Sequence, residues 1–379
     1  MPGTPGILKE FGKCFRIPAS RRKAMGREPG NRRRERMQTQ VMAVSEASIA
    51  RAAKLIQEGK LVGFPTETVY GLGANALDRR AVLGIFEAKG RPADNPLIVH
   101  ISCREEAGAL VRRIPEAAQK LMEAFWPGPM TLILPKADCI CDAVSAGLDT
   151  VGIRLPSSGA ARALIRKAGR PIAAPSANRS GRPSPTTARH VLEDMDGRIP
   201  LILDGGPCQV GLESSVIDAT GDVPVILRPG GITPEMVEAV LGRVRVDEHV
   251  MSPLREGEIA RSPGMKYRHY APSARTVIYE GEPARVIPAI CARYDEAMRA
   301  GERAAILGFD EHDFGGRTRI SLGSEARPEE AAARLFAALR ELDERGETLA
   351  LCEAVDPSGI GLAVMNRMGR AAAFDIVRV

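Results

Sequence analysis

The sequence lacks several features that would place it in whole classes of protein. No apolar run approaches the length of a membrane span, and the amino-terminal segment has no apolar core of the kind that a secretory signal needs. The chain has seven cysteines, an odd number, and Cys139 and Cys141 form the one close pair, without a second pair at zinc spacing. These absences predict a cytoplasmic protein without membrane attachment, with reduced thiols and no metal bound by its own side chains.

The chain outside the amino-terminal segment also lacks an excess of positive charge. The net charge of the chain is +6, but residues 1–41 hold 3 Lys, 8 Arg and 3 Glu and so carry +8. The remaining chain has 42 basic and 44 acidic residues. The basic composition is therefore no argument that the body of the protein binds nucleic acid.

The segment 1–41 has no apolar periodicity, which predicts a disordered basic extension. Two interpretations of it stay open. It could be an arm that makes a weak contact with RNA or tRNA. It could equally be sequence upstream of the true translation start, since Met37 and Met42 both lie just ahead of the first expected helix.

From Ser45 onward, helical and extended patterns alternate. Apolar spacing predicts helices at residues 45–60, 79–89, 114–124, 159–168, 185–194, 233–241, 283–299, 327–345 and 360–372. Short apolar runs between them predict strands, and these strands have both direct and helical connections. That arrangement is typical of an open, twisted, mixed α/β sheet.

Residues 243–272 differ from their surroundings, being polar, proline-containing and non-periodic, as in a linker. The linker nevertheless contains KYRHYAP, with two tyrosines and a histidine, which a plain linker would not need. We therefore expect four parts: a disordered extension (1–41), a larger α/β domain (42–242), a linker that folds over a site (243–272) and a smaller α/β domain (273–379).

Several familiar catalytic and nucleotide-binding signatures are missing. There is no Walker A motif, no HExxH motif and no evident Ser-His-Asp order. The run GLGANA matches the dinucleotide fingerprint G-x-G-x-x-A, but PTETVY separates it from the preceding strand, and basic residues stand where an acidic one is expected. We interpret GLGANA as a tight glycine-rich turn.

The stretch EAKGRPADNPLIVH places Lys89, Arg91, Asn95 and His100 where a helix gives way to a buried strand. Cations at the end of a helix, with Gly90 in the turn, suit ordinary helix termination. The same residues suit an anion site. The stretch alone does not decide between the two.

Two further polar groups follow predicted strands. The loop APSANRSGRPSPTTA supplies short polar side chains and arginines beside a helix start, which suits either an anion-binding loop or an ordinary capped loop. GLESSVID and ILRPGG add Ser214 and Arg228 at strand ends, where ligands bind in open α/β sheets. In FPTETVY, Thr66, Thr68 and Tyr70 would share one face of an extended segment. Together these groups suit phosphoryl or nucleotidyl transfer, which needs positioning and charge neutralisation.

Six ordered motifs carry a resemblance to a known family: PTETVYGLGANA, KGRPADNPLIVH, PSANRSGRPSPT, ESSVID, ILRPG and SPGMKYRHYAP. Together they resemble the two-domain form of the YrdC-type threonylcarbamoyl-adenylate synthases, from about residue 45 to the carboxyl terminus. The family's K-x-R and S-x-N signatures fall on Lys89/Arg91 and Ser176/Asn178. The resemblance implies an open mixed α/β sheet around a basic central cavity, followed by a smaller Rossmann-like domain.

The resemblance also implies a reaction. L-Threonine, bicarbonate and ATP would give threonylcarbamoyl-AMP and pyrophosphate, the first step toward the t6A base of tRNA, with Mg²⁺ on the phosphates and the product passed to the t6A transferase complex. Lys89, Arg91, Ser176 and Asn178 would be catalytic. Threonine would lie among Thr68, His100, Arg154, Ala174 and Ser214. ATP would lie among Arg91, Asn95, Thr150, Ser176, Ser184 and Arg228, with Tyr267 or Tyr270 near the nucleotide.

Two competing functions remain to be weighed against this one. An RNA-binding or ribosome-assembly factor would use the basic extension. A carbamoyl-transfer enzyme acting on carbamoyl phosphate would share the fold but would normally carry zinc-binding and acylphosphatase segments, and neither is evident in the sequence.

Overall fold

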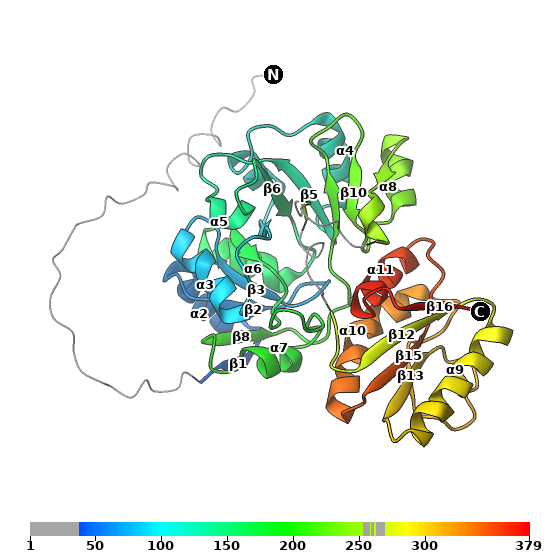
Figure 1. Ribbon diagram of the computed structural model, residues 1–379. Helices are drawn as coiled ribbons and strands as arrows, with labels where there is room; N and C mark the ends of the chain where they lie inside the picture. The colour runs from blue at the N-terminus through cyan, green and yellow to red at the C-terminus, as the bar shows by residue number, and fades with distance from the viewer. Residues whose placement is uncertain (1–37, 253–257, 259–260, 263–269) are drawn as a thin grey trace, which may run out of the picture. The chain divides into compact units, whose positions relative to one another are not determined.

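The computed structural model describes residues 38–252, 258, 261–262 and 270–379, which form two sheets with helices around them (Figure 1). The expectation of a disordered extension falls mostly on residues outside this part. Strand β1 nevertheless begins at Gln40, inside the segment 1–41, and Thr39 donates hydrogen bonds to the carbonyls of Met195 and Ile199.

The larger sheet has the strand order β1-β8-β2-β3-β7-β4-β6-β5-β9-β10-β11 and mixes parallel with antiparallel pairs. Its strands are β1 (Gln40–Ala43), β2 (Val62–Phe64), β3 (Gly71–Asn75), β4 (Ile98–His100), β5 (Met130–Pro135), β6 (Thr150–Arg154), β7 (Ile172–Ala174), β8 (Leu201–Asp204), β9 (Ser215–Asp218), β10 (Val225–Arg228) and β11 (Arg245–Val246). Its helices are α2 (Glu46–Gln57), α3 (Arg79–Lys89), α4 (Glu116–Phe125), α5 (Asp142–Ser145), α6 (Gly159–Ala168), α7 (Ala188–Met195) and α8 (Pro234–Leu241), with 3₁₀ turns at Arg104–Ala109 and Glu248–Val250.

Both faces of the strands at one end of this sheet are buried. In β8, Leu201 and Leu203 pack in a cluster with α2 and α6, whereas Ile202 packs in the cluster that contains α3 and α7. Because successive side chains of a strand point to opposite faces, the sheet has a core on each side. The two cores hold in place the strands at whose ends the sequence predicts polar, ligand-binding residues.

The end of helix α3 places the K-x-R signature. Asp78 caps its start by accepting hydrogen bonds from the backbone N–H groups of Arg80 and Ala81. Gly90 ends it with φ 63°, in the left-handed region that glycine adopts without strain. The helix-termination interpretation is therefore correct for Gly90, while the side chain of Lys89 is buried.

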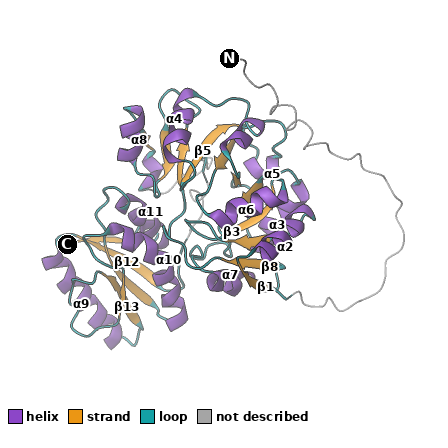
Figure 2. Ribbon diagram, turned by 180° about the vertical axis from the view of Figure 1, so that it is seen from behind, coloured by secondary structure: helices purple, strands orange, loops and turns teal. Residues whose placement is uncertain are grey.

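The smaller sheet is parallel throughout, in the order β14-β13-β15-β12-β16. It consists of β12 (Arg275–Glu280), β13 (Ala304–Gly308), β14 (Arg319–Ser321), β15 (Leu349–Glu353) and β16 (Ile376–Arg378). Helix α9 (Pro283–Arg299) covers one face, and helices α10 (Pro328–Arg345) and α11 (Gly361–Ala371) cover the other (Figures 1 and 2). The predicted fold class, a mixed α/β sheet followed by a smaller Rossmann-like unit, is confirmed.

Some local predictions were wrong. GLGANA is strand β3 rather than a turn, because Gly71 and Gly73 pack against the ring of Phe64 so closely that an added Cβ would lie 2.9 Å from its atoms. The linker begins with strand β11 and a 3₁₀ turn, and the edge strands β14 and β16 were not predicted. No helix in the described part of the chain is long and apolar enough to span a bilayer.

Candidate functional site

The ends of several strands meet at one edge of the larger sheet. Strand β6 ends at Arg154, which pairs in register with Thr131 near the start of β5, and β9 begins beside it at Ser215. Strand β10 runs antiparallel to β9 and ends at Arg228. Strand direction therefore brings together residues that lie up to 97 positions apart in the sequence, from Thr131 to Arg228.

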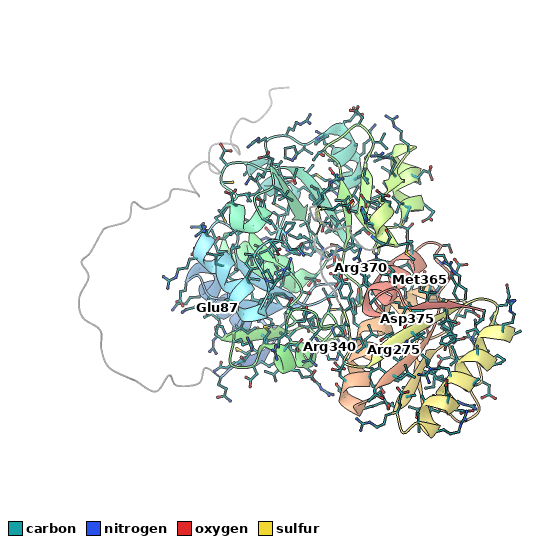
Figure 3. The ribbon with its side chains drawn as sticks, in the orientation of Figure 1. Glu87, Arg275, Arg340, Met365, Arg370 and Asp375 are labelled. Atoms are coloured by element: carbon teal, nitrogen blue, oxygen red, sulfur yellow. The ribbon has the colours of Figure 1, made fainter. Side chains whose placement is uncertain are left out.

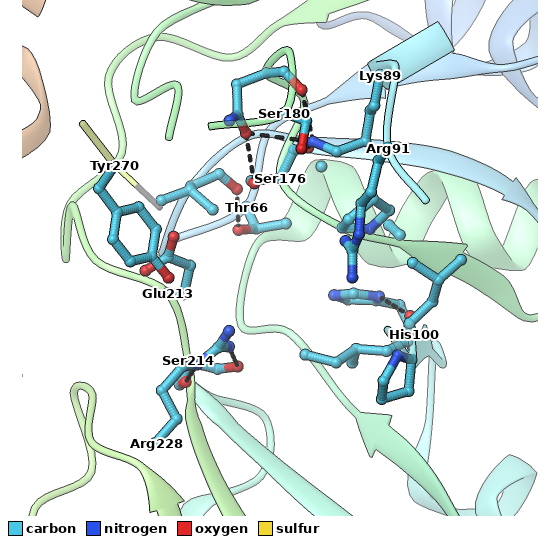
Figure 4. Close-up of a pocket in the computed structure, with 18 of the residues that line it drawn as sticks. Thr66, Lys89, Arg91, His100, Ser176, Ser180, Glu213, Ser214, Arg228 and Tyr270 are labelled. Carbon is cyan, nitrogen blue, oxygen red and sulfur yellow. Dashed lines mark hydrogen bonds between the residues drawn. The ribbon is translucent and has the colours of Figure 1, made fainter. Parts of the chain in front are cut away.

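A cavity lies at this edge, with an empty volume of about 760 Å³ measured out to its mouth. Arg91, Ser176 and Arg228 all line it (Figure 4). The other sequence-predicted residues that line it are Lys89, His100, Arg154, Ala174, Asn178, Ser214 and Tyr270.

Four predicted residues are not in the cavity wall. Thr68 is buried behind it, with its hydroxyl 2.8 Å from that of Thr66, which does line the cavity. Ser184 is buried and donates to Glu213, and Thr150 lies beside a separate small pocket. Asn95 is fully buried. Tyr267 lies outside the described residues, so Tyr270 is the linker tyrosine that the structure places at the cavity.

Lys89 connects the two family signatures. Its ammonium donates to the carbonyls of Ser176 at 2.5 Å and Asn178 at 2.6 Å, and the Ser176 hydroxyl donates to the Asn178 side-chain oxygen at 2.5 Å. Only 4% of Lys89 is exposed, and this burial holds the pKa of its amine well below the ordinary value. A bound polyanion would raise that pKa again, so the amine is placed to respond to a phosphate.

Arg91 follows the helix and reaches into the cavity from a different direction (Figure 4). Its guanidinium lies 5.7 Å from the centre of the Phe86 ring and donates to the Asn95 carbonyl at 3.0 Å. The Asn95 side chain is fully buried, and its amide nitrogen and oxygen have no hydrogen-bond partner among the residues that the structure describes. A buried amide without partners is costly in a folded protein, so a ligand group that bonded it would be favoured.

Arg154 and His100 form another part of the wall. Arg154 donates to the Glu67 carboxylate at 2.6 Å, and both side chains are buried. Burial alone would raise the pKa of Glu67, but the Arg154 guanidinium outweighs it and keeps the pKa below its ordinary value. Burial, with a smaller contribution from Arg154, lowers the pKa of His100 to about 3, so its imidazole is neutral near pH 7.

Hydroxyls and a guanidinium meet around Ser214. The Ser214 hydroxyl lies 2.8 Å from that of Thr131, and Arg228 donates to the Ser214 carbonyl at 3.1 Å and its hydroxyl at 3.3 Å. Burial lowers the pKa of Arg228 to about 10, which still leaves it charged at neutral pH.

A carboxylate that was not predicted also lines the cavity. Glu213 accepts from the Ser184 hydroxyl at 2.5 Å and from Nε of Arg367 at 3.0 Å. Burial would raise its pKa, but Arg367 and Arg228 hold the pKa below the ordinary value, so Glu213 is ionised. The residue stands inside the motif ESSVID, but its partner Arg367 lies 154 positions away, and no local pattern pairs the two.

The cavity therefore combines cations with hydroxyls, and each of the two carboxylates described here is bonded to an arginine. Within the described part of the chain, no group of three or more His, Cys, Asp or Glu side chains could hold a metal ion. Such a wall can bind an anion and fix hydroxyl-bearing substrates, but it offers a metal no acidic ligand set of its own.

Comparison with known proteins identifies the family. Residues 54–230 match the Sua5/YciO/YrdC family, described as "Telomere recombination", and residues 232–373 match "Threonylcarbamoyl-AMP synthase, C-terminal domain". The chain is 48% identical over 339 residues to a threonylcarbamoyl-AMP synthase of Pyrococcus abyssi, covering 89% of this chain and 97% of the relative. It is also 48% identical over 343 residues to that of Bacillus subtilis, covering 90% and 97%.

A solved structure agrees. The crystal structure of P. abyssi Sua5 complexed with L-threonine superposes with a TM-score of 0.85 at 47% identity, covering 90% of this chain and 99% of that chain. One family of proteins thus matches both halves of the sequence and both sheets. The chain belongs to the two-domain, Sua5-type family of threonylcarbamoyl-AMP synthases.

Proposed function

We propose that the cavity binds ATP and L-threonine side by side and that its own cations and hydroxyls carry the reaction of this family. The chain is a threonylcarbamoyl-AMP synthase, a nucleotidyltransferase that serves the t6A modification of tRNA. The observation that carries the site assignment is the meeting of Arg91, Ser176 and Arg228 in one cavity.

The nucleotide end of the cavity is proposed to lie between the two family signatures and Arg228. Lys89 and Arg91 come from the end of α3, and Ser176 and Asn178 come from the loop after β7. Their donors suit phosphate oxygens. Tyr270 offers an aromatic ring at the same cavity.

The threonine end is proposed to lie near Arg154, His100 and Ser214. The Arg154 guanidinium suits the substrate carboxylate, and the Ser214 hydroxyl suits the hydroxyl of threonine. A site that bonds the substrate hydroxyl penalises an amino acid without one, because its own polar groups are then left without partners. Ala174 lines the cavity as well and leaves room beside them.

The chemistry suits a wall of this kind. Bicarbonate releases hydroxide to give CO2, and the threonine amine forms an N–C bond to it with loss of a proton, which yields a carbamate. A carbamate oxygen then forms a bond to the α-phosphorus while the bond from that phosphorus to the bridging oxygen breaks, and pyrophosphate leaves. Two anions must approach one another, and at 4 Å their repulsion is about 4 kcal/mol at an effective dielectric near 20. Lys89, Arg91 and Arg228 offset that repulsion.

Mg²⁺ is proposed to enter as part of the nucleotide. Glu67 and Glu213 are each bonded to an arginine, so phosphate oxygens rather than carboxylates would be its ligands. The ion would neutralise phosphate charge, and the side chains would orient the nucleotide. We further propose that the reaction takes place in the cytoplasm and that the labile adenylate is handed to the transferase that modifies tRNA.

The test mixes purified protein with ATP, threonine and ¹⁴C-bicarbonate and follows pyrophosphate together with labelled adenylate. Both signals should require all three substrates, and 2-aminobutyrate, which lacks the hydroxyl of threonine, should be a poorer substrate than threonine. Formation of product from carbamoyl phosphate without bicarbonate would instead support carbamoyl transfer. RNA binding that persists in an Arg91→Ala variant without any adenylate formation would support an RNA-binding factor.

A further inference from the structure

Two arginines of the five-stranded unit are buried against segments that line the cavity. Arg367 lies on α11 with no exposed surface, and Arg340 lies on α10 with 2% exposed. Arginine is almost never so buried unless it is paired. Each donates to a carboxylate of the larger sheet unit, Arg340 to Asp194 and Arg367 to Glu213, more than 100 positions earlier in the chain.

Arg367 contacts the two segments that carry Ser214 and Arg228. Its Nε donates to the Glu213 carboxylate at 3.0 Å, and a terminal nitrogen donates to the Pro229 carbonyl at 2.7 Å. The other terminal nitrogen lies 3.4 Å from the Glu213 carbonyl. Glu213 immediately precedes Ser214, and Pro229 immediately follows Arg228, so one guanidinium ties both segments together.

Charge gives this contact a second consequence. Glu213 is an ionised carboxylate in the wall of a cavity that is proposed to receive polyanionic ATP. A bare carboxylate there would repel the phosphates, and the low dielectric of a buried site would strengthen the repulsion. Arg367 supplies the balancing charge from outside the cavity wall, since it is not itself among the lining residues.

We propose that Arg367 is a positioning residue of the synthase reaction: it neutralises Glu213 and fixes the Ser214 and Arg228 segments, so that α11 completes the nucleotide site. This inference rests on the proposed binding of ATP in the cavity. It gives the five-stranded unit a role in substrate affinity in addition to folding.

Arg340, labelled in Figure 3, makes a similar contact with the segment that carries Arg182. It donates to Asp194 at 2.7 Å and to the Pro183 carbonyl at 2.6 Å. The second carboxylate oxygen of Asp194 accepts from Arg182 at 2.5 Å, and Arg182 lines the cavity. Through Arg340, helix α10 therefore fixes Arg182 of the cavity wall by way of the Asp194 carboxylate. Through Arg367, helix α11 neutralises the charge of Glu213.

The test compares Arg367→Met, Glu213→Gln and the double variant by steady-state pyrophosphate release. A unit charge about 10 Å from a bound anion changes its affinity roughly tenfold to thirtyfold at an effective dielectric near 20. Arg367→Met should therefore raise the KM for ATP by about that factor, and added salt should reduce the effect. Adding Glu213→Gln should bring the KM back to within about threefold of wild type, because no bare charge is left.

Arg275→Met is the matched control. Arg275 belongs to the same unit and pairs with Asp375 at 3.0 Å, but its side chain is 68% exposed (Figure 3). This variant should keep the wild-type KM. The single variant Glu213→Gln is a second measurement that does not depend on the folding of Arg367→Met. It removes the negative charge from the cavity wall, so it should lower the KM for ATP at low salt.

A purely structural role for Arg367 predicts a different pattern. Activity would fall with the fraction of folded protein, the KM would stay constant, and the double variant would be no better than Arg367→Met. That result, or an unchanged KM in Glu213→Gln, overturns the inference. An unimpaired Arg91→Ala variant would instead overturn the proposed site, so the two failures can be told apart.

Discussion

Replacement of Arg91 by alanine should separate catalysis from stability. Two contacts of the side chain are a hydrogen bond to the Asn95 carbonyl and the face of the Phe86 ring. Such contacts contribute about 1–2 kcal/mol to folding, which corresponds to a fall of no more than about 2–4 °C in Tm for a chain of this size. The loss of a guanidinium that stabilises developing phosphate charge costs about 2.7–4 kcal/mol, or about 100- to 1,000-fold in kcat/KM.

The assay follows pyrophosphate release at varied ATP and fixed threonine, with thermal unfolding measured on the same preparations. Arg91→Lys keeps the charge but loses the planar pair of donors, so we expect an intermediate activity. Arg79→Ala, at an exposed position at the start of the same helix, should match wild type in both measurements. Wild-type kcat/KM in Arg91→Ala would refute the assignment of Arg91, and a loss of activity that merely follows a large fall in Tm would show a structural role.

Three further predictions concern other parts of the cavity. Lys89→Met should reduce kcat by about 100-fold or more, because the K-x-R and S-x-N segments lose the donor that joins them; a circular dichroism spectrum like that of wild type would exclude misfolding. His100→Gln should raise the KM for threonine more than that for ATP, and it should flatten the loss of stability on acidification. The pKa of His100 is about 3 in the folded state and near 6.5 in the unfolded state, so between these pH values only the unfolded state binds the extra proton. His100 therefore destabilises the fold as pH falls, by up to about 1.4 kcal/mol per pH unit. A difference in urea midpoint between wild type and variant that is the same at pH 4.5 and at pH 7 would contradict this. Gly230→Ala should abolish activity, because an added Cβ would lie too close to the Ser215 backbone nitrogen. Its control is Gly242→Ala, at a glycine with open space around it but a positive φ. This variant should lose stability and keep the wild-type KM.

Local patterns predicted the helices well where caps and apolar spacing agree. Helix α3 has the predicted bounds, because Asp78 and Gly90 end it by local hydrogen bonding and backbone conformation. The glycines of β3 gave the opposite result. Glycine favours turns in isolation, but here the ring of Phe64 occupies the space in which a side chain would lie, and such packing is not visible in a local pattern.

Within the candidate site, the residues that carry motifs were predictable, and their partners were not. Lys89, Arg91, Ser176 and Asn178 stand in short ordered segments that sequence comparison can recognise. Glu213 and Arg367 acquire their relation only through packing of α11 on the cavity wall. The charge balance of the cavity is therefore a property of tertiary structure, because its positive and negative members come from segments that are distant in the chain.

The most direct test of the central claim is a crystal structure of the protein with threonine and an ATP analogue whose α,β-bridge cannot be cleaved. Our prediction is that the phosphates lie beside Arg91, Ser176 and Arg228, and the threonine carboxylate and hydroxyl beside Arg154 and Ser214, with the amine facing the α-phosphate. Nucleotide bound away from this cavity, or threonine too far from the α-phosphate for a carbamate to bridge them, would contradict it.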